Sequence, residues 1–194
     1  MRAAVLVPIK GFGRAKGRLA EHLDHTERAE LARRLAATVL SAADPLAVWV
    51  VCDDDEVELF ADGHGARVVR HASQGLNDAV QHAVEVMAAD GIDRVVVAHG
   101  DLPYARQLAW VADFDGVTLV PDRHDDGTNV ICIPTGSGFT FAYGPGSFSR
   151  HLDHAAMIGL ATRVVRDSAL GLDIDTPADL ATVDTWTIPD SPRS

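Results

Sequence analysis

The stretch LDIDTPADL, residues 172–180, holds two carboxylates with a spacing that suits a metal site. Asp173 and Asp175 flank a single isoleucine. In an extended chain, side chains alternate between two faces, so both carboxylates point the same way. Like charges held so close repel each other unless a cation lies between them. A divalent ion that prefers oxygen ligands, such as Mg²⁺, turns this repulsion into coordination.

A third carboxylate and a group of cations follow other apolar runs. Asp101 comes directly after the run RVVVAHG (94–100), and both lysines of the chain, Lys10 and Lys16, lie in KGFGRAKGR (10–18). In open α/β sheets, ligands bind beyond the carboxyl ends of the strands. We therefore predict that Asp101 joins the two later aspartates around Mg²⁺, opposite a phosphate chain that the cationic loop binds.

The glycines of this loop give only a partial motif. Gly11 and Gly13 form G-x-G, but Lys16 stands where a dinucleotide-binding fingerprint has its third glycine, and the P-loop spacing is also missing. We interpret Gly11, Gly13 and Lys16 as nucleotide contacts. A solvated basic face is the plainer alternative.

The aspartates have a structural alternative as well. Asp101 would cap a helix that opens at Pro103, and Asp175 would cap one that opens at Pro177. Capping leaves Asp173 unexplained, whereas a shared metal ion accounts for the pair.

Composition excludes several classes of function. With 194 residues and a net charge of −11, the chain lacks the basic face that a nucleic-acid partner requires. No apolar run is long enough to span a bilayer, and the start indicates a buried strand, not a signal peptide. Cys52 and Cys132 lie in apolar stretches, as reduced thiols of a cytoplasmic protein do. Whether the chain forms a homo-oligomer is left open.

Seven apolar, β-branched runs alternate with helical patterns. The runs are 3–9, 47–52, 66–70, 94–100, 116–121, 129–134 and 162–166. Most are continuous, which is typical of strands covered on both faces of a parallel sheet. We predict an α/β three-layer sandwich with a mostly parallel, Rossmann-like sheet and some antiparallel pairing in 116–148. We expect residues 1–186 to form a single domain and residues 187–194 to form a frayed tail.

Other polar residues define no further site. His151 and His154 are three apart on an expected helix, without the Cys or carboxylates that would complete a zinc site, so we expect both at the surface. Ser137 and Ser147 lie among glycines but lack the G-x-S-x-G pattern of a hydrolase.

Six segments together resemble a known family. In order between Val7 and Leu180 they are VPIKGFGRAKGRL, QGLNDA, HGDLP, VPDRHDDGTN, YGPGSF and LDIDTPADL. They resemble the guanylyltransferases of deazaflavin coenzyme F-420 biosynthesis (the CofC/FbiD family), MobA-like nucleotidyltransferases with a GT-A-type fold. The resemblance implies transfer of GMP from GTP to phosphoenolpyruvate or 2-phospho-L-lactate, with release of pyrophosphate.

The resemblance also implies a role for each residue at a matching motif position. Asp101, Asp173 and Asp175 would hold Mg²⁺. Lys16 and Arg18 would act on the triphosphate, together with Asp101 as catalytic groups. The implied nucleotide contacts include Gly75 and Asn77, and the implied contacts to the acid are Thr128, Gly144 and Ser147.

Two alternatives stay open beside this interpretation. One is a related transferase with molybdopterin or a sugar 1-phosphate as acceptor, although VPIKGFG departs from the Leu-Ala-Gly-Gly start of the wider superfamily. The other is a nucleotide-binding module without catalytic activity.

Overall fold

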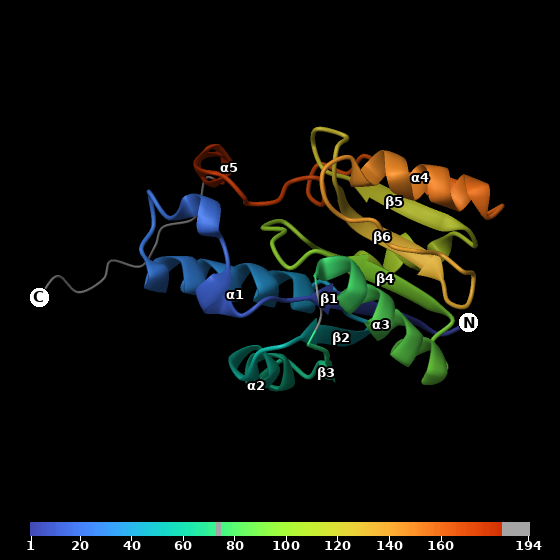
Figure 1. Ribbon diagram of the computed structural model, residues 1–194, viewed down its shortest axis with the longest axis horizontal. Coiled ribbons are helices and arrows are strands. Elements are labelled where there is room, and N and C mark those ends of the chain that lie inside the picture. The colour runs from blue at the N-terminus through green and yellow to red at the C-terminus, as the bar shows by residue number, and fades with distance from the viewer. Residues whose placement is uncertain (73–74, 184–194) are drawn as a thin grey trace, which may run out of the picture.

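The computed structural model describes residues 1–72 and 75–183, and the predicted tail 187–194 lies outside them. The described residues form one sheet with helices on both faces (Figure 1). Its strands are β1 (Ala3–Pro8), β2 (Ala47–Cys52), β3 (Arg67–Arg70), β4 (Arg94–Ala98), β5 (Val117–Pro121), β6 (Thr128–Pro134) and β7 (Thr162–Val164). The α-helices are α1 (His25–Ser41), α2 (Asp55–Gly63), α3 (Leu76–Ala89), α4 (Ser147–Met157) and α5 (Pro177–Thr182).

The strand order is β3-β2-β1-β4-β6-β5-β7, and β6 is the reversed strand among them. It pairs antiparallel with both β4 and β5, whereas the pairs among β1 to β4 and between β5 and β7 are parallel. This confirms the predicted mostly parallel sheet with antiparallel pairing in 116–148. The reversal puts the first residue of β6, Thr128, at the edge where the other strands end.

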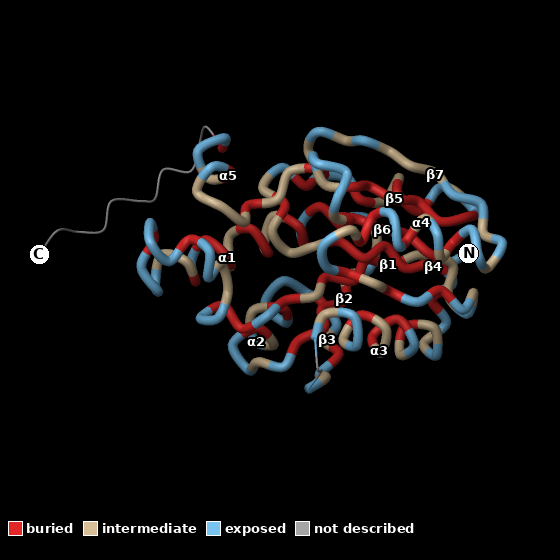
Figure 2. The backbone as a smooth tube through the Cα atoms, turned by 45° about the horizontal axis from the view of Figure 1, so that its top comes forward, coloured by how far each residue is buried: buried red, intermediate tan, exposed pale blue. Residues whose placement is uncertain are grey.

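Alternating residues of the continuous apolar strands supply two separate cores. Val5 and Val7 of β1 pack with α1 and α2, while Ala4 and Leu6 pack with α3 and α4. All four side chains are fully buried, and the strands form the buried centre in Figure 2. The predicted three layers are therefore confirmed.

A third, smaller apolar cluster connects the start of the chain to its last helix. Its buried residues are Leu19, Leu23, Leu31, Leu35, Ile174 and Val183. Figure 1 shows the segment before α5 passing next to the N-terminal loop and the start of α1. This packing fixes residues 10–23 against residues 172–183.

Residues 172–175 belong to no strand of the described sheet. Two local alternatives for the aspartates are corrected. The side chain that caps α5 is Thr176, which accepts from Asp179 N–H, so Asp175 is not the cap. No helix begins at Pro103. The capping explanations of Asp101 and Asp175 are therefore wrong.

Asp24 and Glu27 form a reciprocal capping box at the start of α1. The prediction for the cysteines is confirmed, since Cys52 and Cys132 are buried free thiols. Among the described helices, none is both long and apolar enough to cross a membrane.

Candidate functional site

The three predicted carboxylates meet in space. One oxygen each from Asp101, Asp173 and Asp175 lies within 4.8 Å of the others. Between the two later aspartates, Ile174 is fully buried in the third cluster, and its N–H donates to the Asp101 carbonyl at 3.3 Å. Burial of Ile174 turns its two neighbours toward Asp101, which explains why a single apolar residue separates them.

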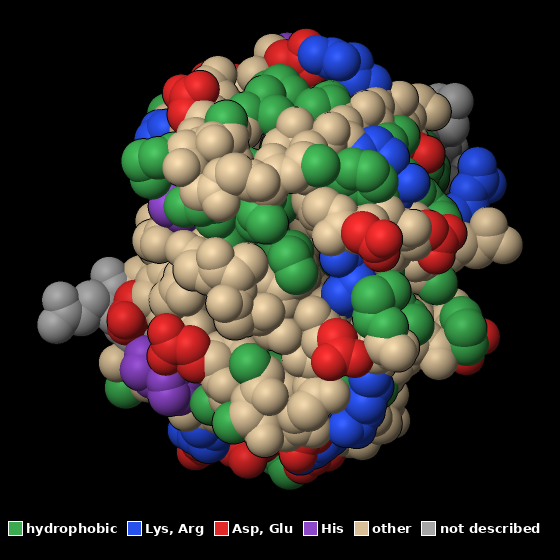
Figure 3. Space-filling model, turned by 90° about the vertical axis from the view of Figure 1, so that its right-hand side faces the viewer, with side chains coloured by type: hydrophobic (Ala, Val, Ile, Leu, Met, Phe, Trp, Pro, Cys, Tyr) green, Lys and Arg blue, Asp and Glu red, His purple; other side chains and the backbone are tan. Residues whose placement is uncertain are grey.

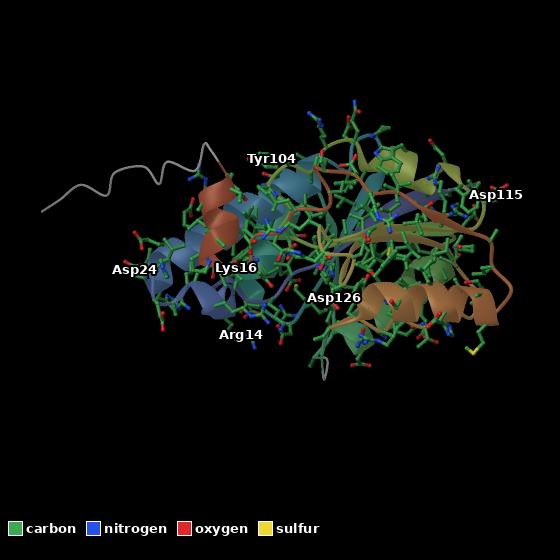
Figure 4. The ribbon with its side chains drawn as sticks, turned by 90° about the horizontal axis from the view of Figure 1, so that it is seen from above. Arg14, Lys16, Asp24, Tyr104, Asp115 and Asp126 are labelled. Carbon is green, nitrogen blue, oxygen red and sulfur yellow. The ribbon has the colours of Figure 1, made fainter. Side chains whose placement is uncertain are left out.

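Lys16 holds two members of this carboxylate cluster. Its Nζ lies 2.6 Å from Asp101 Oδ2 and 3.2 Å from Asp175 Oδ1, and only 7% of its side chain is exposed. Its backbone is left-handed, with φ at 55°, which costs a non-glycine residue about 1–2 kcal/mol. A strained backbone of this kind persists where the surrounding contacts fix it, often at functional sites. Figure 4 shows Lys16 beside Arg14 at the end of the molecule that carries α5.

The electrostatics of the cluster favour a cation. Burial opposes the charge of Lys16, but Asp101 and Asp175 outweigh it and raise the pKa of the ammonium. Burial likewise opposes the charge of Asp101, whose pKa is nevertheless lowered by Lys16. Asp173 has no such partner: burial, and then repulsion from Asp101 and Asp175, raise its pKa. One ammonium therefore does not compensate all three carboxylates.

The donor set fits a hard, oxygen-preferring dication. Asp101 Oδ1 is buried and has no hydrogen-bond partner within the described residues. An uncompensated buried carboxylate oxygen is costly, and a metal ion is one of the few groups that satisfies it. Three carboxylates without a Cys or His ligand suit Mg²⁺ better than zinc.

A cavity of about 620 Å³ opens beside the cluster. The charged residues that line it are Lys10, Arg14, Lys16, Arg18, Asp101 and Asp175. A second cavity of about 300 Å³ adjoins it between the ends of β1 and β2 and the start of α3, and shares Lys10 and Arg14 with it. A site of this size and cationic lining can take a nucleoside triphosphate.

His99 is a cavity residue that the sequence analysis did not single out. It lines the larger cavity, two residues before Asp101, and its buried Nε2 has no hydrogen-bond partner in the described part of the chain. Its position in the HGDLP motif, two residues before Asp101, was the sequence feature that could have identified it as a site residue.

The residues predicted to contact the nucleotide are only partly brought to the cavities. Gly75 lines the smaller one and starts α3 with φ at 143°. Gly11 and Gly13 line neither; a side chain at these positions would collide with Asp54 or press on His25. The absence of a side chain at Gly11 and Gly13 thus permits close packing of the loop.

Asn77 uses its amide within the protein. Its Oδ1 accepts from Tyr143 N–H at 2.6 Å, and its Nδ2 donates to the Tyr143 carbonyl at 3.3 Å. Asn77 therefore ties α3 to the segment that leads into α4.

Two of the three residues predicted to hold the acid are buried apart from the cavities. Thr128 and Ser147 are 1% and 2% exposed, whereas Gly144 is exposed and left-handed, with its carbonyl accepting from Ser147 N–H at 3.0 Å. None of the three lines either cavity. Thr128 adjoins the carboxylate cluster through the next residue, Asn129, whose carbonyl accepts from His99 N–H and whose side chain reaches Asp173 Oδ1 at 3.5 Å.

The surface prediction for His151 is wrong. Its side chain is fully buried, with Nδ1 3.0 Å from Thr128 Oγ1 and Nε2 2.9 Å from Ala142 N. Phe148, Leu152 and Ala155 recur at helical spacing around it, and this apolar stripe was the signal that indicated burial. His154, which is half-buried, accepts from Thr140 N–H at 3.0 Å.

Charge is distributed differently away from the site. The end of the molecule opposite α5, seen in Figure 3, carries small interspersed groups of acidic and basic side chains. The concentration of cations on one loop is therefore a property of the site and not of the whole surface.

Comparisons with known proteins identify the family and the fold of this chain. A family profile described as "Guanylyl transferase CofC like" matches residues 3–184. The chain is 36% identical to a phosphoenolpyruvate guanylyltransferase of Sphaerobacter thermophilus, over 93% of this chain and 91% of that protein. It is 32% identical to a 3-phospho-D-glycerate guanylyltransferase of Phenylobacterium zucineum, over 94% and 89% of the two chains.

The fold has solved counterparts. A structure from Methanothermobacter named as a nucleotidyl transferase matches with a TM-score of 0.63 and 21% identity, over 94% of this chain and 95% of that one. At this identity the likeness shows the fold alone. With the profile match over nearly the whole chain and the relatives above 30% identity, the chain belongs to the CofC-like guanylyltransferase family.

Proposed function

We propose that this protein transfers GMP from GTP to phosphoenolpyruvate in a Mg²⁺-dependent reaction that releases pyrophosphate. The observation that carries the proposal is the meeting of Asp101, Asp173 and Asp175 beside a cationic cavity, with Lys16 Nζ in contact with two of them. A non-catalytic nucleotide-binding module has no evident need for three converging carboxylates. Following the resemblance, the product would serve coenzyme F-420 biosynthesis.

The chemistry needs positioning and charge neutralisation more than a strong base. The phosphate of the acid is already an anion and attacks the α-phosphorus of GTP directly, so no proton has to be removed from it. The bond to pyrophosphate breaks as the new phosphoanhydride forms, and negative charge grows on the departing oxygens. Mg²⁺, when bound by the three aspartates, supplies positive charge and orients phosphate oxygens.

The cationic loop has a specific part in this reaction. Lys16 and Arg18 both contact Asp175, at 3.2 and 3.5 Å, and both line the larger cavity. From there they can donate to the β- and γ-phosphates and stabilise the pyrophosphate that leaves. Lys16, the more buried of the two, is the stronger candidate because a desolvated charge acts with less screening.

A second acceptor has support of its own. The Phenylobacterium relative is named for 3-phospho-D-glycerate and covers as much of this chain as the Sphaerobacter relative does. Phosphoenolpyruvate, 2-phospho-L-lactate and 3-phospho-D-glycerate are all small anions with a phosphate and a carboxylate. We place phosphoenolpyruvate first, because it is the acceptor in the name of the relative with the higher identity.

Product identification tests the proposal. The protein is incubated with GTP, Mg²⁺ and the three acids together, and the products are resolved by mass spectrometry. We expect pyrophosphate and a guanylylated phosphoenolpyruvate. Release of free GMP, or absence of turnover with every acid, would contradict a transferase of this class. A molybdopterin or sugar 1-phosphate acceptor is tested in parallel.

A further inference from the structure

His151 is the buried titratable group that the proposed mechanism leaves unused. It lies on the inner face of α4, fully covered. Aromatic rings enclose it, with the centroid of Tyr143 at 5.0 Å, that of Phe139 at 5.8 Å and that of Phe141 at 6.3 Å. A side chain so placed cannot touch a substrate, but it can fix the orientation of a neighbour that does.

The hydrogen bonds of His151 determine where its proton lies. The Ala142 N–H can only donate, and it points to Nε2 at 2.9 Å, so Nε2 must carry a lone pair. Burial, together with nearby Arg150, lowers the pKa of His151 to about 4, so the ring is neutral at pH 7. A neutral ring with an unprotonated Nε2 carries its one proton on Nδ1.

This proton in turn determines the polarity of the Thr128 hydroxyl. Nδ1–H donates to Thr128 Oγ1 at 3.0 Å, so Oγ1 acts as the acceptor in that bond. Within the described residues, His151 is the one hydrogen-bond partner of this hydroxyl. The hydroxyl proton is thus directed away from His151 and left available to another acceptor.

We propose that His151 is a positioning residue that holds the Thr128 hydroxyl as a hydrogen-bond donor toward an anionic group of the acid substrate. The inference rests on the proposed function and on the resemblance, which implies that the acid binds beside Thr128. Thr128 begins β6 at the edge of the sheet where Asp101 lies, next to Asn129, which is bonded to His99. A donor fixed in this direction matches a carboxylate or phosphate oxygen, which only accepts.

Two matched variants separate the two bonds of His151. His151→Asn puts an amide near the place of Nδ1, where it can still donate to Thr128 Oγ1. His151→Gln puts its amide near the place of Nε2, where it can still accept from Ala142 N–H. Each variant keeps one buried hydrogen bond and loses the other, so their costs in stability are comparable. Steady-state rates are measured with phosphoenolpyruvate and GTP varied in turn, and folding is checked by circular dichroism.

The expected result is a split in KM between the two variants. His151→Gln should raise the KM for phosphoenolpyruvate by about tenfold, as expected for a weakened bond to an anion, and leave the KM for GTP unchanged. His151→Asn should stay near the wild-type KM for both. In a Thr128→Val background, His151→Gln should have no further effect. Equal changes in both variants, or additive effects with Thr128→Val, would overturn the inference.

A spectroscopic measurement tests the inference without turnover. The ¹⁵N chemical shifts of labelled His151 at pH 7 should be those of a neutral ring protonated on Nδ1. A ring protonated on Nε2 would overturn the inference while leaving the proposed function standing. A wild-type protein that guanylylates none of the three acids would overturn the proposed function, and with it the role of His151 in binding the acid.

Discussion

The two walls of the site hold their polar groups in opposite ways. The cationic wall, residues 10–18, presents charged side chains to a cavity, and Lys16, Arg14 and Arg18 form ion pairs with Asp101, Asp53 and Asp175. The buried wall, formed by Thr128, Ser147 and His151, has uncharged groups that are almost fully covered. In Figure 4, Lys16 lies near α5, whereas Asp126, close to the buried wall, lies near the start of α4.

This difference indicates that the two walls have different functions. The exposed charges of Arg14 and Arg18 can exchange one partner for another when a triphosphate arrives, at low cost in a solvated cavity. Buried neutral groups keep one hydrogen-bond pattern and can discriminate between small acids, because an unpaired buried group is penalised strongly. We infer that the cationic wall serves charge and rate, and that the buried wall serves acceptor selectivity.

The largest effect is expected at the carboxylates that the two walls share. Asp101→Asn and Asp173→Asn should each reduce kcat/KM by about 10²-fold or more, because the metal loses a ligand. Asp55→Asn, at an exposed carboxylate paired with Arg70, is the control and should behave as wild type. Pyrophosphate release measures the rates. A near-normal rate in a folded Asp173→Asn protein would remove the metal site from the mechanism.

Lys16→Met should lower the rate with GTP and at the same time strengthen metal binding. The kcat/KM for GTP should fall about 10–100-fold, because a donor to the departing charge is lost. In the absence of nucleotide, Mn²⁺ should bind more tightly, because the ammonium no longer competes for the oxygens of Asp101 and Asp175. Calorimetry measures the affinity. The control is Arg14→Met, which should leave the Mn²⁺ affinity unchanged because the Arg14 guanidinium pairs with Asp53. Weaker Mn²⁺ binding by Lys16→Met would contradict competition between the ammonium and the metal.

The buried wall should respond to pH more than the cationic wall. The folded-state pKa of His151, about 4, is below its ordinary value of 6.5, so its contribution to stability is present above pH 6.5 and is lost as the pH falls toward 4. The wild type should lose up to about 3 kcal/mol of unfolding free energy over this range that His151→Gln does not lose. Urea unfolding at several pH values measures this. His22→Gln, at an exposed histidine, should keep the wild-type profile; identical slopes in wild type and His151→Gln would argue against a buried neutral ring.

The smallest effect is expected at Ile174, the buried residue between Asp173 and Asp175. Ile174→Val should lower the unfolding free energy by about 1 kcal/mol and weaken Mn²⁺ binding, because Ile174 aims its two neighbours. Ile133→Val, equally buried in the core below α4, should have the same cost in stability with no change in Mn²⁺ affinity. Equal Mn²⁺ affinity in the two variants would show that Ile174 only fills space.

The cationic wall and the carboxylates could be predicted from the residues themselves, whereas Thr128 and Ser147 of the buried wall followed only from the resemblance and His151 was missed. Continuous apolar runs located the strands, and charges placed after them pointed to the site edge. Pairing is a tertiary property, and residues 172–175 belong to no strand of the described sheet. The capping alternative for Asp175 fails because Thr176, one residue later, supplies the capping oxygen. His151 was predicted at the surface from its spacing to His154, whereas the apolar stripe of Phe148, Leu152 and Ala155 around it indicated burial.

The most direct test of the central claim is a titration of Mn²⁺ into the wild type and into Asp101→Asn/Asp173→Asn, followed by electron paramagnetic resonance. We predict saturable binding by the wild type that is lost in the folded double variant. Binding of the same affinity in both proteins would contradict a metal site formed by these three aspartates.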